Sequence, residues 1–172
     1  MPSVTQIPAL PPLLAVAVRP LPLAPLQVVL SLLLRRIVGR HPDIFERLGE
    51  HAGKRFGLDP TDLPFAFILR PTPPTPSIRA VRELPRTGLD ARIAGPLAAL
   101  LGLASGRLDG DALFFSRDLS VTGDIAAVVA LRNAVDDAGL DLLAEAALLF
   151  GPLAPVAQRA CHAAAAAFGP WS

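Results

Sequence analysis

The chain has 172 residues and a formal net charge of +1, from 16 basic and 15 acidic side chains. This balance gives no electrostatic case for a nucleic-acid partner, which usually requires a clustered basic surface. Apolar residues make up 52% of the chain and charged residues only 18%, and the mean hydropathy is +0.47. Two explanations compete for this aliphatic excess: a soluble protein with an apolar cavity or partner-facing helices, and insertion into a membrane.

The sequence of residues 7–34, the best candidate for a membrane-spanning segment, argues against insertion. A spanning helix needs about 20 mostly apolar residues in a row, but this region carries Arg19 and a high density of prolines. It also lacks the basic start and the cleavage site of a secretory signal. The single Cys161 excludes an internal disulfide. We therefore expect a cytoplasmic protein in which residues 1–22 form an extended, proline-rich apolar tail.

Two helices and three strands are predicted in the first part of the chain. Apolar residues at helical spacing predict a helix over 25–39, which Gly39 ends. Pro42 and Asp43 suit the first turn of a second helix, over 42–52. A short apolar run and two alternating patterns then predict three strands, at 65–70, 77–84 and 89–94.

The next part of the chain predicts a helix, a strand and another helix. Gly95 and Pro96 open a helix over 96–105, and a short strand follows at 119–122. Gly123 makes a turn and Asp124 caps a helix over 125–138. The predicted apolar face of that last helix carries Ile125, Val128, Val129 and Val135.

The remaining residues predict two apolar helices, at 140–150 and 154–168. Helices with so few charges are expected to be covered by the domain, a partner or a bilayer surface. Glu145 is the acidic residue with the most apolar sequence surroundings, since it lies among leucines and alanines, and we expect an exposed, non-catalytic position for it.

The sequence contains no nucleophile elbow, dinucleotide loop or phosphate loop. The three histidines are dispersed, and Cys161 and His162 point about 100° apart if they lie in a helix, so they cannot pair. Asp109 begins like a calcium loop, but the twelfth position is Ser120 instead of glutamate. We therefore predict no catalytic residue, no metal site and no cofactor.

Leu113, Phe114 and Phe115 lie between the predicted helices at 96–105 and 125–138. Their bulky apolar side chains can line a cavity, or they can simply fill the core. The residues alone leave both interpretations open.

The run from Leu113 to Asp124 also fits the pattern LFF-x-R-x-L-x-[IV]-x-G-D. Its matching residues are Leu113, Phe114, Phe115, Arg117, Leu119, Val121, Gly123 and Asp124. This run resembles the later half of the sterol-carrier-protein type lipid-binding domain, and within it the bacterial subgroup of accessory factors for anaerobic ubiquinone biosynthesis. The resemblance covers residues 23–140; the proline-rich stretch at 71–76 and a poorly marked first strand near 54–58 depart from it.

The resemblance implies an α/β (α+β) fold in which helices cover a mostly antiparallel sheet of about five strands and enclose an apolar tunnel. Helices at both ends would be additions, with residues 141–172 serving as a lid, a partner contact or a membrane contact. The residues expected to contact ligand are Leu97, Leu101, Leu113, Phe114, Phe115, Ile125, Val128 and Val129.

The function that the resemblance implies is non-catalytic. The protein would carry a hydrophobic lipid, in the subgroup a polyprenylated ubiquinone precursor, and would work with ubiquinone-biosynthesis proteins and contact the inner membrane transiently. The alternative is an accessory protein that docks to a membrane or a partner and has no lipid ligand of its own.

Overall fold

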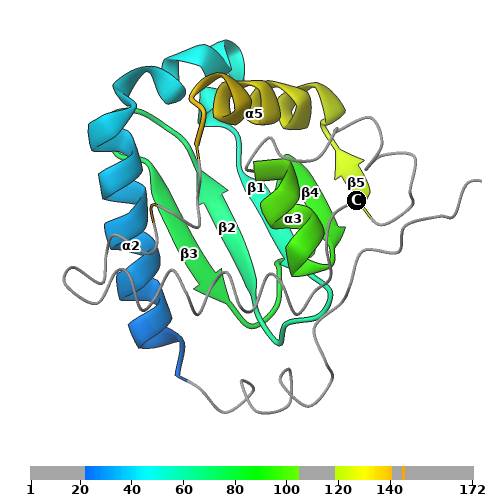
Figure 1. Ribbon diagram of the computed structural model, residues 1–172. Helices are drawn as coiled ribbons and strands as arrows, with labels where there is room; N and C mark the ends of the chain where they lie inside the picture. The colour runs from blue at the N-terminus through cyan, green and yellow to red at the C-terminus, as the bar shows by residue number, and fades with distance from the viewer. Residues whose placement is uncertain (1–21, 105–118, 141–144, 146–172) are drawn as a thin grey trace, which may run out of the picture.

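The computed structural model describes residues 22–104, 119–140 and 145 (Figure 1). The described helices are α2 (Leu23–Arg40), α3 (Leu97–Ala104) and α5 (Ile125–Asp137), with 3₁₀ segments η1 (Pro42–Ile44) and η2 (Glu46–Gly53). The described strands are β1 (Phe56–Pro60), β2 (Ala66–Arg70), β3 (Ser77–Val81), β4 (Ala91–Gly95) and β5 (Ser120–Gly123). The predicted α+β class is confirmed.

The five strands form one sheet in the order β3-β2-β1-β4-β5. β1 and β4 are parallel and the other neighbours are antiparallel, which confirms the mostly antiparallel sheet expected from the sequence. The central strand is β1, which the sequence marks least clearly. Phe56 in this strand is fully buried, and Gly57 lies against Leu84 and Leu89, where a Cβ atom would come within 2.7 Å of Leu89 Cδ1.

The helices cover one face of this sheet, with α2 beside β3 and with α3 and α5 over β1 and β4 (Figure 1). Gln27 fixes α2 to the edge strand. Its Nε2 donates to the carbonyl of Ile78 at 2.7 Å, and its Oε1 accepts from the backbone N–H of Ala80 at 2.9 Å. The side-chain amide therefore occupies the place that a further strand's peptide group would take on this edge.

Most boundaries shift by one or two residues from the sequence-based prediction, and two differences have a clear cause. Residues 42–52 do not form one α-helix, because Gly49 has φ 53° and ψ −125°, which interrupts the 3₁₀ turns. β3 ends at Val81 and not at Leu84, because its register partner Ala66 is the first residue of β2. The helices predicted at 140–150 and 154–168 lie outside the described residues, apart from Leu140 and Glu145.

The turn from β5 into α5 is built as the sequence predicts. Gly123 has φ +86°, and the backbone N–H of Asp124 donates to the carbonyl of Asp90 at 2.8 Å. The carboxylate of Asp124 caps α5 by accepting from the N–H of Ala127 at 2.9 Å, and it also pairs with Lys54. These two interactions lower the pKa of Asp124, the contribution of Lys54 being the larger, so the cap stays charged to more acidic pH than an isolated aspartate would.

We predict that Gly123→Ala destabilises the fold by at least about 1–3 kcal/mol. The new Cβ would lie 2.3 Å from the carbonyl oxygen of Asp90, in a backbone conformation that disfavours any side chain. Gly39→Ala is the matched control, since a Cβ there meets nothing within 4 Å. Urea unfolding should show a neutral or stabilising effect for Gly39→Ala; equal midpoints for the two variants would contradict this account of the turn.

Candidate functional site

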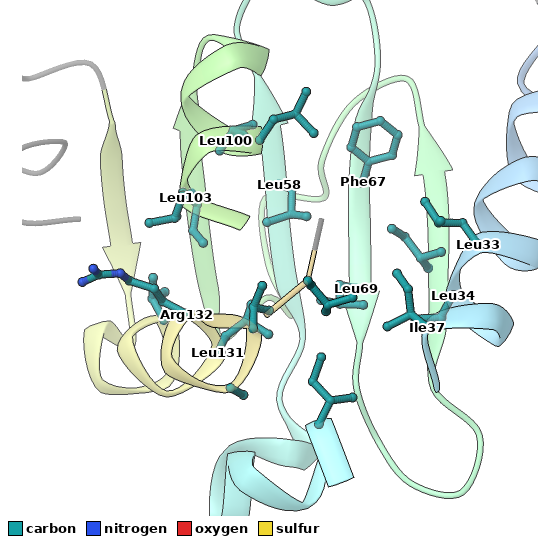
Figure 2. A pocket seen from close by; sticks show the side chains of 18 of the residues that line it. Leu33, Leu34, Ile37, Leu58, Phe67, Leu69, Leu100, Leu103, Leu131 and Arg132 are labelled. Atoms are coloured by element: carbon teal, nitrogen blue, oxygen red, sulfur yellow. The ribbon is translucent and has the colours of Figure 1, made fainter. Parts of the chain in front are cut away.

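A cavity of about 330 Å³ lies between the helices and the sheet (Figure 2). Its walls come from α2, η1, η2, α3 and α5 and from strands β1 to β4. The described lining residues are Leu30, Leu33, Leu34, Ile37, Ile44, Phe45, Leu48, Leu58, Phe67, Leu69, Ile78, Ile93, Leu97, Leu100, Leu101, Leu103, Val128, Leu131, Arg132, Ala134, Val135 and Leu140. Among these described residues, Arg132 alone has a polar side chain.

The wall on the α2 side follows from helix periodicity. Leu30, Leu33, Leu34 and Ile37 are spaced by three and four residues, so they share one face of α2, and that face points into the cavity. Figure 2 shows three of them pointing toward the sheet. The helical pattern was visible in the sequence, but without the sheet opposite, it could not be told from ordinary core packing.

The floor of the cavity follows from strand alternation. Leu58, Phe67, Leu69, Ile78 and Ile93 each occupy a position whose side chain points to the helical face of the sheet. The opposite face is more polar: Asp59 and Arg92, which alternate with Leu58 and Ile93, form an ion pair there.

The cavity lies against two buried clusters, and α5 bridges them. Val128 belongs to one cluster with Phe56, and Ala134 belongs to the other with Phe45, while Leu131 packs against both. The start of α3 is fixed as well, since the N–H of Leu97 donates to the carboxylate of Asp62 at 2.8 Å.

The residues predicted to contact ligand fall into three groups in the structure. Leu97, Leu101 and Val128 line the cavity, where a ligand could contact them; that contact stays a prediction. The run from Leu113 through Phe114 to Phe115 lies outside the described residues.

Ile125 and Val129 do not share the inward face of Val128, contrary to the sequence-based prediction. They are 59% and 42% exposed. The buried face of α5 centres near Leu131, and at about 100° per residue Ile125 and Val129 lie about 120° and 160° away from it. Their β-branched, apolar character made them look like core, but their helical phase places them outside.

Glu145 is also placed differently from the prediction. Its expected exposed position is wrong, because the residue is only 7% exposed. Its carboxylate pairs with Arg36 Nε at 3.0 Å and with Arg40 Nη1 at 2.7 Å, one helical turn apart on α2. Two arginines thus compensate the buried charge, which ties residue 145 to the helix that walls the cavity.

The described residues contain no group of three or more histidine, cysteine or acidic side chains placed to hold a metal ion. Within the same ranges, no helix combines the length and the apolar character that crossing a bilayer requires.

The chain belongs to the SCP-2 sterol transfer family, whose model matches residues 32–136. This confirms at family level the resemblance carried by the run that ends at Asp124. The matched region holds most of the cavity wall, from Leu33 to Val135.

Among solved structures, the chain is similar to one described as "UbiJ-SCP2 Ubiquinone synthesis protein". The two are 22% identical, cover 69% of this chain and 95% of that one, and superpose with a TM-score of 0.54, which shows a shared fold. Sterol carrier protein 2 from Yarrowia lipolytica in its apo form is 15% identical, with 64% and 91% covered and a TM-score of 0.45. The sterol carrier protein domain 2 of Helicoverpa armigera is 14% identical, with 63% and 86% covered and a TM-score of 0.45. No curated protein matches the chain.

Proposed function

We propose that this protein is a non-catalytic carrier that holds the aliphatic chain of a lipid in its cavity. The observation that carries the proposal is the composition of the wall, where the described lining is aliphatic or phenyl except for Arg132. Ordered water needs two to four polar partners, and such a wall offers almost none. An apolar chain that enters gains about 25 cal/mol for each Å² it removes from water.

The lipid we propose is a polyprenylated ubiquinone precursor, and the process is oxygen-independent ubiquinone biosynthesis. Three observations support it: membership of the SCP-2 family, the sequence resemblance to the bacterial subgroup, and the fold shared with a protein named for ubiquinone synthesis. A volume of about 330 Å³ is at the small end of the range for ligand pockets. The cavity therefore suits a few isoprene units of the prenyl chain. The partners that receive the head group of the precursor would be ubiquinone-biosynthesis proteins.

Leu100→Trp should fill part of the cavity and weaken the binding of farnesol, a short prenyl alcohol, by about tenfold or more. Ile125→Trp adds the same side chain at an exposed site on α5 and should bind farnesol as the unmodified protein does. Native mass spectrometry and a fluorescence titration of the full chain measure the binding, and thermal unfolding checks that both variants fold. Farnesol binding that Leu100→Trp leaves intact would place the ligand elsewhere, and failure of the unmodified protein to bind would overturn the proposal.

A second candidate function, docking to an anionic membrane surface, is favoured by the outer face of α2. Val28 and Leu32 are 58% and 47% exposed there, on the side of the helix away from the cavity. The charged residues of α2 are all arginines: Arg36 and Arg40 pair with Glu145, and Arg35 is exposed beside the apolar stripe. An apolar stripe beside basic side chains is the arrangement that binds anionic lipid surfaces. Docking of this kind would bring the cavity wall next to a source of lipid.

We predict that the full chain floats with vesicles of phosphatidylcholine and phosphatidylglycerol and that Val28→Ser with Leu32→Ser abolishes flotation. The substitution removes apolar area that the bilayer would bury, while the cavity-facing side of α2 is unchanged. Ile125→Ser, at another exposed apolar position, is the control and should float normally. Flotation that resists the double substitution would rule out α2 as the docking surface; flotation without any farnesol binding would favour docking over lipid carriage.

A further inference from the structure

Arg132 is the exception in an otherwise apolar lining. It lies on α5, next to Leu131, and contributes to the cavity wall although its side chain is 24% exposed. Figure 2 shows its guanidinium group turned away from the leucines of the cavity and toward the edge of the site. Its methylene stem therefore borders the apolar space, while its charge lies at the margin.

Within the described part of the chain, the guanidinium of Arg132 forms an ion pair with Asp136. Arg132 Nε lies 3.3 Å from Asp136 Oδ2, a partner one helical turn further along α5. A partly exposed pair of this i,i+4 kind contributes only about 0.3–0.5 kcal/mol to stability. The ion pair with Asp136 is thus only a weak structural reason for an arginine at this position.

We propose that Arg132 binds the carboxylate head of a lipid whose aliphatic chain occupies the cavity, an inference that rests on the proposed lipid-binding function. The two terminal nitrogens of a guanidinium match the two oxygens of a carboxylate and form parallel, charge-assisted hydrogen bonds. A chain buried among the leucines would leave its polar end at the margin, where this group lies. Arg132 would thereby select acidic single-chain lipids over neutral ones.

Dodecanoate and dodecanol test this selection, because they have equal chains and differ only in the head. At pH 7.4 the unmodified full chain should bind dodecanoate about tenfold more tightly than dodecanol, as one charge-assisted pair allows. Arg132→Gln should lose this preference and keep its affinity for dodecanol, while Arg132→Lys should keep part of the preference. Arg79→Gln is the control, since Arg79 is exposed on β3 at a position that alternates with the cavity-facing Ile78.

Titration calorimetry below the micellar concentration gives both affinities for each variant. Equal binding of the two lipids by the unmodified protein, or a preference that survives Arg132→Gln, overturns the role of Arg132 and leaves lipid carriage standing. Binding of neither lipid overturns both proposals together. Because Arg132→Gln keeps two of the three methylene groups of the stem, dodecanol binding also reports whether the variant has retained its cavity.

Discussion

The cavity depends on polar contacts that fix α2 to the edge strand β3 and the start of α5 to the turn after β5. Gln27 fastens α2 to β3 by bonding to the carbonyl of Ile78 and the N–H of Ala80. On the other side, Asp124 fixes the start of α5 by its bond to Asp90 and its pairing with Lys54. Because these contacts hold α2 at the edge strand and α5 at its first turn, the apolar side chains of the helices and of the sheet face a space that they do not fill.

Unfilled apolar volume is costly in a protein interior, because the lining side chains lose dispersion contacts. The two buried clusters on which α5 rests supply the compensating packing, through Val128 on one side and Ala134 on the other. The ion pairs of Glu145 with Arg36 and Arg40 bring a later part of the chain against α2 as well. A lipid chain in the cavity would restore the missing dispersion contacts, and this is the physical reason to regard the cavity as a binding site.

Periodicity in the sequence predicted the elements well where one pattern ran uninterrupted. The helix at α2, the four later strands and the capped helix α5 follow from alternation, helical spacing and the Gly123–Asp124 pair. The central strand β1 was poorly marked because Gly57, Asp59 and Pro60 weaken its strand propensity, and only its neighbours on both sides make it a strand.

The site was harder to predict than the fold. Of the residues predicted to contact ligand, Leu97, Leu101 and Val128 line the cavity. Ile125 and Val129 do not, because an apolar residue type does not reveal helical phase. The contribution of α2 and of strand residues such as Leu58 and Phe67 needed the tertiary arrangement. A residue that lines a cavity and one that fills a core have the same local pattern, and only the distance between layers separates them.

The central claim, that the apolar space between the sheet and the helices is occupied by a lipid chain, is tested most directly by methyl NMR. The full chain labelled at leucine, isoleucine and valine methyl groups would be titrated with farnesol. The account predicts the largest shift changes at Leu33, Leu58 and Leu131, which face the cavity, and little change at Ile125, which faces away from it. Changes confined to exposed methyls such as Ile125, or no saturable change at all, would contradict it.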